Sequence, residues 1–496
     1  MKGAKLLTRH STQAAPARGL GASLLGLGLA LGCAFGAASA QTVTLADALK
    51  QALRPDNPTL QQQDDNVAAA AGRAQQAKGA FDWTTNVQGG WQQLYVPTPE
   101  NGFLTNRTST VGSYYYSANV GRRFRNGIEV APGVTAYPGS GATPAQTSGL
   151  TQIRPALGLK IPLLRGAGTA NADAAERGAA HALESARESR SFALQQFAQT
   201  VAATFWRCVA DDQILRETDE ADRHSADYET TLNKMLKQGL IEPTVVQQWS
   251  ANNVTQHLGV DRARDDSQRC RRDLTYVMTG GVSEPWPQAS GDLPRIDSLS
   301  QALDQANEQA LVLLALDQRP DLKAASRNVL AARENVRSAK DSARPQLDLH
   351  VDPDRAIVSF SRTFGNNLAK GREAEASAAE DQAALALRQL QDQVRNQVSD
   401  AVANLKRSAS DWAALDGAQR QMEVVVGDAE KRARYGSISW SDFLNAQNQL
   451  SQLRQQVINA RLAFAVNLSM LRLATGAIDP DQPFALAADL TKLPTP

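Results

Sequence analysis

Residues 57–60 read Asn57-Pro58-Thr59-Leu60, and residues 319–322 read Arg319-Pro320-Asp321-Leu322. The same offset of 262 positions (320 minus 58) relates two further pairs of dipeptides, namely Asn66-Val67 with Asn328-Val329, and Ala77-Lys78 with Ala339-Lys340. Chance similarity between alanine-rich helices does not explain three matches at one offset. The pattern indicates an internal duplication, which decides the architecture before any single residue does.

A second pair of similar segments lies farther along the chain, one after each of these. Gly239-Leu240-Ile241 comes about 40 residues before Thr279-Gly280, and Gly436-Ser437-Ile438 precedes Thr475-Gly476 by the same distance. Each repeat is therefore predicted to contain a helix, then strands, then a long helical hairpin.

The first forty residues have the features of a signal peptide. Basic residues lead into an apolar stretch at 20–37, and Ala38-Ser39-Ala40 forms a small-residue cleavage site, so the mature chain is expected to begin at Gln41. Lipid modification of Cys33 is an alternative, although Ala30-Leu31-Gly32 fits such a site poorly. Beyond the leader, no stretch was expected to reach the roughly 18 apolar residues that a membrane helix needs.

Charge and cysteine content exclude some classes of protein. Removal of the leader takes away four basic residues and changes the formal net charge from +1 to −3, which argues against a nucleic-acid-binding protein. The mature chain keeps Cys208 and Cys270. These two residues form either a disulfide in an oxidising compartment or two small buried side chains on helices.

The longest helices are predicted on either side of the repeated glycines. No proline interrupts the chain from Gly166 to Gln238, and about 70 helical residues at a rise of 1.5 Å would span roughly 105 Å. The last helix carries a heptad seam, with large and small positions three residues apart. The large positions are Phe443, Leu450, Val457, Phe464 and Leu471, and the positions three further on are Ala446, Leu453, Ala460, Asn467 and Ala474.

The two hairpin tips have recognisable turn chemistry. Gly239 suits a helix C-cap and Pro243 the first turn of the returning helix. At the second tip, Gly436 ends a helix, and one of three side chains caps the next: Ser439, Ser441 or Asp442.

Between the helices, apolar and polar residues alternate with a period of two, as they do in strands that expose one face to solvent. The alternation is clearest from Phe81 to Gln92, where tryptophans and valine alternate with polar residues. Aromatic residues are concentrated here, which favours a membrane barrel over a soluble sandwich. The other candidate segments are 113–124, 128–137, 153–163, 347–351 and 355–361. Because membrane barrels have at least eight strands, several chains would have to share one barrel.

The duplicated order of helix, strands and hairpin resembles the TolC-like outer-membrane efflux and secretion channels, the outer membrane factors. The segment from Arg434 to Gln447 resembles that family's glycine-led hairpin tip and returning helix, and Leu471-Arg472-Leu473-Ala474-Thr475-Gly476 resembles the end of that helix. Ile161-Pro162-Leu163-Leu164-Arg165-Gly166 resembles its exit from strand to long helix. Together these segments extend the resemblance over the mature chain.

The resemblance implies a fold that is mainly α with membrane β. Three chains would share a 12-stranded barrel, four strands from each, on a long periplasmic coiled-coil tunnel, and each chain would hold two repeats. The first strand region, from Phe81 to Leu163, is far longer than the second, from Pro345 to Ser361, so additional strands from repeat 1 are the alternative. The implied layout begins with a signal peptide (1–40). Repeat 1 then holds an equatorial segment with the first tunnel helix (41–80), barrel strands (81–165) and a hairpin with its tip near 239 (166–284), and a linker and equatorial region follows (285–320). Repeat 2 holds a tunnel helix (321–344), a short strand pair (345–364) and a hairpin with its tip near 436 (365–476), and the chain ends in a C-terminal tail (477–496).

The implied function is a passive exit duct in the outer membrane, serving a tripartite efflux pump or a type I secretion system. Its implied partners are two further copies of the chain, outer-membrane lipid, a periplasmic adaptor (membrane fusion protein) and an inner-membrane pump, with no nucleic acid. The resemblance implies adaptor docking at Gly239, Leu240, Gly436, Ser437 and Ile438. It also implies a role for Asp442 in the selectivity of the periplasmic gate, although that side chain alternatively only caps a helix.

No catalytic, cofactor or metal site is predicted, because the histidines beyond the leader are scattered and no phosphate-binding loop occurs. The alternative function is a periplasmic coiled-coil adaptor or scaffold without a pore. Two positions depart from the family pattern, because Ala433 replaces a common aromatic residue and Asn445 a common acidic one. The cargo is not encoded in any motif.

Overall fold

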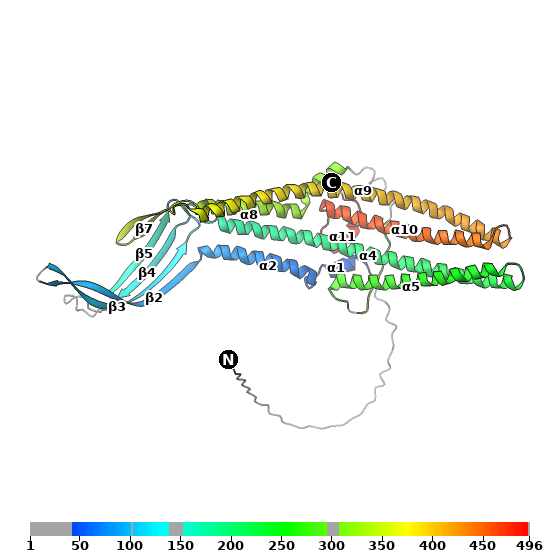
Figure 1. Cartoon of the computed structure of the whole chain (residues 1–496), viewed down its shortest axis with the longest axis horizontal. Coiled ribbons are helices and arrows are strands. Elements are labelled where there is room, and N and C mark those ends of the chain that lie inside the picture. Colours follow the sequence, from blue (N-terminus) through cyan, green and yellow to red (C-terminus); the bar gives the residue numbers. More distant parts are fainter. Residues whose placement is uncertain (1–41, 101–102, 138–151, 283, 295–306, 495–496) are drawn as a thin grey trace, which may run out of the picture. The chain divides into compact units, whose positions relative to one another are not determined.

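The computed structural model describes residues 42–100, 103–137, 152–282, 284–294 and 307–494. The predicted signal peptide, including Cys33, lies outside these residues, as does 295–306 of the predicted linker. The described residues belong to one compact unit, Ala40–Pro496, which is shown in colour in Figure 1.

Two long helical hairpins make up most of this unit. They are α4 (Ala174–Lys237) with α5 (Pro243–Thr279), and α9 (Asn367–Arg434) with α10 (Trp440–Thr475). Helix α5 packs on α4, α4 on α10, and α10 on α9, as Figure 1 shows. At 64 residues, α4 confirms the prediction of a single very long helix, although it begins after a short separate turn. The shorter helices are α1 (Leu45–Ala52), α2 (Pro58–Lys78), α3 (Thr169–Ala172), α7 (Glu308–Gln318), α8 (Pro320–Ser342) and α11 (Pro483–Asp489).

The predicted heptad seam forms the buried stripe of α10. All five large positions, from Phe443 to Leu471, are buried, whereas most of the positions three residues further on are only half-buried. Among the described residues, α10 is also the one helix long and apolar enough to cross a membrane by length and composition, contrary to the expectation from the sequence. Half of that apolar window is buried inside the structure, as expected of a core helix.

The strands form an antiparallel six-stranded sheet in the order β2-β3-β4-β5-β7-β8. Their bounds are β2 Trp83–Glu100, β3 Phe103–Arg123, β4 Glu129–Tyr137, β5 Gln152–Pro162, β7 Gln346–Asp352 and β8 Arg355–Ser361. All six segments that alternate in the sequence are therefore strands. A separate two-stranded parallel sheet pairs β1 (Thr42–Val43) with β6 (Gln288–Ala289).

The strand number corrects the prediction of four per chain. Repeat 1 contributes four strands to the described sheet, because β4 and β5 pair over all nine residues of β4, from Glu129 opposite Lys160 to Tyr137 opposite Gln152. A ladder of this length is a hairpin of the sheet and not a connecting loop. A barrel of twelve strands with four from each of three chains does not match this sheet.

In each repeat, the segment that begins the first helix lies against the segment that ends the hairpin. In repeat 1 the start of α2 lies against the end of α5, where the Asn57 side-chain amide donates to the carbonyl of Val277 at 3.2 Å. In repeat 2 the start of α8 lies against the end of α10, where the Arg319 guanidinium donates to the carbonyl of Ala474 at 3.2 Å. Each joint thus stacks a proline-led helix on a helix that ends in Thr-Gly.

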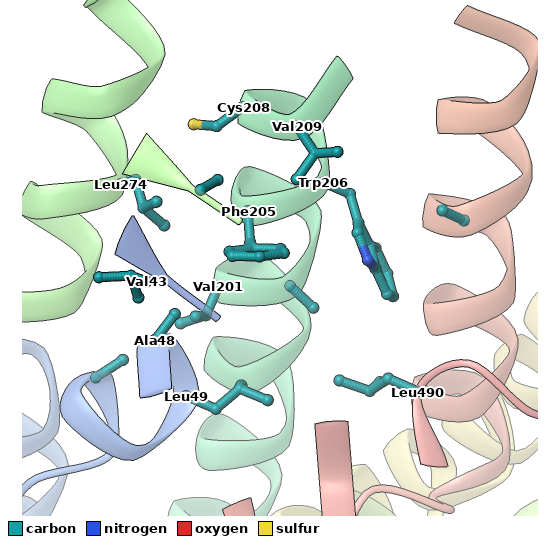
Figure 2. Close-up of a cluster of buried hydrophobic side chains, with 14 of the residues drawn as sticks. Val43, Ala48, Leu49, Val201, Phe205, Trp206, Cys208, Val209, Leu274 and Leu490 are labelled. Carbon is teal, nitrogen blue, oxygen red and sulfur yellow. The ribbon is translucent and has the colours of Figure 1, made fainter. Parts of the chain in front are cut away.

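The core beside the first joint gathers side chains from α1, α4, α5, α10 and α11. Figure 2 shows Phe205 of α4 on the same side of the helix as Val43 and Leu274, and Trp206 on the other side. In the same cluster Cys208 and Cys270 form a disulfide with a Cα–Cα distance of 5.4 Å, which decides between the two alternatives left open by the sequence.

Candidate functional site

The six-stranded sheet has one apolar face. Directly opposed residues of antiparallel strands share a face, so the register can be followed from strand to strand. Val87 lies opposite Ala118, which lies opposite Val134, and farther across the sheet Leu159 lies opposite Val351. The large apolar side chains that share this face are Trp83, Val87, Trp91, Tyr114, Tyr116, Val120, Val130, Val134, Ile153, Leu157, Leu159, Ile161, Leu347, Leu349, Val351, Val358 and Phe360.

Much of this apolar face is open in the single chain. Val87 is 74% exposed, Ile153 68% and Phe360 64%. Because these side chains lie on strands from both repeats, the exposed surface crosses the whole sheet. Contiguous exposed apolar surface of this kind indicates contact with a membrane or another protein.

The opposite face of the sheet is polar. One cross-strand row runs from Arg123 through Glu129 and Lys160 to His350. The Lys160 ammonium lies 3.6 Å from carboxylate oxygens of both Glu129 and Asp348, and Arg123 lies 3.9 Å from Glu129. Nearby positions on this face hold the small residues Gly121, Ala131, Gly133, Ala156 and Gly158. Such a surface favours contact with water.

The two hairpin tips share one backbone geometry. Gly239 and Gly436 adopt positive φ angles of 72° and 68°. At the first tip the Leu240 amide donates to the Met235 carbonyl at 3.0 Å, and at the second the Ser437 amide donates to the Arg432 carbonyl at 2.8 Å. Both are Schellman turns, in which glycine ends the helix because it adopts the left-handed conformation without a Cβ penalty.

The predicted docking residues differ in exposure. Leu240 is 65% exposed and Ser437 is exposed, whereas Ile438 is half-buried. Ile438 and Ile241 pack from the two turns against one shared hydrophobic cluster. The structure therefore brings the two tips of one chain together.

Asp442 belongs to the cap of α10. Ser439 is the N-cap residue, and its hydroxyl accepts from the Asp442 amide at 3.0 Å and donates to the Asp442 carboxylate at 2.7 Å. Ser441 instead donates to the Gln248 side chain of α5 at 2.6 Å. The Asp442 side chain remains exposed, so capping leaves its charge open to solvent.

Sequence reasoning missed a group of aromatic rings beside the tips. The aromatic cluster, as we name it, consists of Tyr228 from α4, Trp249 from α5, and Trp440 and Phe443 from α10. Its ring centroids lie 5.1–6.5 Å apart, and Trp249 and Phe443 are fully buried. The signal was three large aromatic residues within about ten positions of the tip glycines.

The described residues hold no group of three or more His, Cys, Asp or Glu side chains that could bind a metal ion. The candidate site consists of the two faces of the sheet and the pair of tips.

Solved structures with the same fold as this chain exist, and they come from outer membrane proteins. The Campylobacter jejuni CmeC outer membrane channel is 12% identical, with a TM-score of 0.64 over 91% of this chain and 90% of that one. The outer membrane protein VceC from Vibrio cholerae is 16% identical, with a TM-score of 0.63 over 87% of this chain and 96% of that one. The open state of the Neisseria gonorrhoeae MtrE outer membrane channel is 14% identical, with a TM-score of 0.59 over 87% of this chain and 88% of that one.

The chain has the TolC-like fold of the outer membrane factor channels. No protein-family model matches the sequence, and a search of curated proteins finds no significant match. CmeC and MtrE are outer membrane channels.

Proposed function

We propose that the chain is one subunit of an outer-membrane exit channel that extends into the periplasm as a passive duct. The exposed apolar face of the sheet carries this proposal. A sheet that is apolar on one side and polar on the other matches a barrel wall between lipid and a water-filled lumen. Strands β5 and β8 lead into the helices that bear the hairpins.

Several chains are needed to close the wall. The sheet leaves β2 and β8 as free edges, and six strands are fewer than the eight of the smallest membrane barrels. Among the four long helices, α5 and α9 are likewise the edges. Exposed apolar residues lie at matching heights on these edges, with Val254 eleven residues after the start of α5 and Val424 ten residues before the end of α9.

Contact between one edge and the opposite edge of the next chain is heterologous, and such contacts form a ring when the rotation between neighbouring chains closes. We propose a homotrimer that docks a periplasmic adaptor at the paired tips and works with an inner-membrane pump. The chain serves tripartite efflux or type I secretion, and the pump supplies the energy and selects the cargo.

Planar bilayer recordings test the channel directly. Purified oligomer is expected to give discrete conductance steps in salt solution. A detergent-stable oligomer without such steps would favour the rival function, a periplasmic adaptor or scaffold without a pore. That rival gives no role to the exposed apolar face.

Asp442 is proposed to concentrate negative charge at the periplasmic end of the duct, where rings of carboxylates favour cations. Asp442→Asn is expected to shift the reversal potential across a salt gradient toward weaker cation preference. The matched control is Ser439→Ala, which removes the cap at a cost of about 0.5–2 kcal/mol but retains the charge. An unchanged reversal potential in Asp442→Asn would leave the residue with its capping role alone.

A further inference from the structure

The aromatic cluster joins the two hairpins of one chain. Tyr228 and Trp249 belong to the first hairpin, and Trp440 and Phe443 belong to the second. The Phe443 ring lies 5.1 Å from that of Tyr228 and 6.0 Å from that of Trp249. Edge-to-face and stacked ring pairs at these distances attract beyond the effect of burial alone.

Hydrogen bonds reinforce the same connection. The Tyr228 side chain lies near the Glu430 carboxylate of α9, which in turn lies 2.6 Å from the Arg434 guanidinium. The Trp249 indole N–H donates to the Ser225 carbonyl of α4 at 2.9 Å and fixes the ring within the first hairpin. The bond from Ser441 to Gln248 adds a second polar link between the hairpins.

The helices are held differently farther from the tips. Between the aromatic cluster and the core at the joints, the hairpins meet through polar groups such as Gln256, Asn448 and Arg454. A cavity of about 710 Å³ lies between α4, α9 and α10 there, lined by charged side chains that include Arg216, Glu220 and Asp416. The apolar contact at the tips is thus separate from the core at the joints, and polar contacts lie between the two.

From this arrangement we propose that the aromatic cluster holds the two tips of a chain together as one rigid body, so that the spacing of the tips is fixed within a chain and can vary only between chains. The two tip turns belong to the same rigid body, because Ile241 and Ile438 both pack on the cluster. A partner that contacts Leu240 and Ser437 would therefore meet a surface of constant spacing. The inference rests on the proposed channel only in its reference to neighbouring chains.

Spin labels measure the two kinds of motion separately. Lys237→Cys and Lys431→Cys place labels on exposed sites of the two hairpins. The native Cys208 and Cys270 are paired, so they do not react with the label. Doubly labelled chains diluted with unlabelled chains report the intrachain distance by pulsed electron paramagnetic resonance, and singly labelled Lys431→Cys oligomers report the interchain distance.

The intrachain distance distribution is expected to be narrower than the interchain one. Trp249→Ala is expected to broaden it, whereas Leu313→Ala, an apolar truncation at an exposed site of α7, leaves it unchanged. Because Trp249→Ala could unfold the chain, Phe443→Leu serves as a milder variant, with helix content checked by circular dichroism. An intrachain distribution as broad as the interchain one, or one insensitive to both cluster variants, would overturn the inference. Absence of any interchain coupling would instead count against the multi-chain channel.

Discussion

Gly239 and Gly280 share a left-handed backbone but differ in their surroundings. An added Cβ at Gly239 would meet no atom within 4 Å, whereas at Gly280 it would lie 2.5 Å from Cδ of Pro58. The tip glycine is therefore required only by its φ angle. The joint glycine is required by its φ angle and also by the close approach of α2.

This difference predicts unequal stability losses. Gly239→Ala is expected to cost about 1–2 kcal/mol for the left-handed backbone. Gly280→Ala is expected to cost about 1–3 kcal/mol more, because Pro58 must move. Thermal unfolding of the detergent-solubilised proteins measures both changes. Equal melting temperatures for the two variants would show that the joint tolerates a side chain.

Tyr228 is expected to make the stability of the tip region fall as the pH rises through the alkaline range. Burial, together with the hydrogen bond to Glu430, raises the pKa of Tyr228 to about 12 from an ordinary value of 10. The folded state therefore binds this proton more tightly than the unfolded state does. The contribution to stability is complete below pH 10 and is lost as the pH rises toward 12.

Tyr228→Phe removes the titrating hydroxyl and keeps the ring. The melting temperature of the wild type is expected to exceed that of the variant near pH 9, and the difference is expected to shrink between pH 10 and pH 12. A difference that stays constant over this range would mean that the hydroxyl is not coupled to folding.

At the scale of single elements, the disulfide fixes α4 to α5 in one hairpin only. It joins residues 62 positions apart, and closing a loop of this length stabilises by about 4 kcal/mol in the chain-entropy model. Among the described residues no cysteine lies in the second hairpin, which relies on the α9–α10 packing.

Reduction is expected to lower the melting temperature of the wild type. The double variant Cys208→Ser with Cys270→Ser is expected to melt near the reduced wild type and to be insensitive to dithiothreitol. The variant also serves as the control for effects of the reductant elsewhere. A wild type whose melting is unchanged by complete reduction, verified by thiol counting, would contradict a stabilising role.

The periodicity of the sequence was sufficient to predict the hairpins, the tip turns and all six strand segments, because each of these features is local. The strand number per chain was predicted wrongly because analogy with the family replaced the pattern, although the 128–137 and 153–163 segments alternate as clearly as the others. Local periodicity cannot reveal that Pro58 meets Gly280 across more than two hundred residues. It cannot reveal either that Tyr228, Trp249 and Phe443 converge from three helices.

At the scale of the whole chain, the two edges of the structure come from different repeats. Repeat 1 supplies β2 and α5 at one edge, and repeat 2 supplies β8 and α9 at the other. The proposed ring therefore joins repeat 1 of one chain to repeat 2 of the next. Within a chain, β5 and β7 make the corresponding junction in the sheet.

The two faces of the sheet allow a matched test of membrane contact on adjacent residues of β2. Val87 lies on the apolar face opposite Ala118, and Gln88 lies on the polar face opposite Ser117. An arginine on a lipid-facing strand position costs about 1–4 kcal/mol, depending on depth, because its charge must leave water. Val87→Arg is therefore expected to weaken folding into lipid vesicles, measured by urea titration, and to reduce recovery in the outer-membrane fraction. Gln88→Arg adds the same charge one residue away, where the proposed lumen keeps it hydrated, and is expected to insert like the wild type. Equal losses in the two variants would mean that lipid does not cover the apolar face.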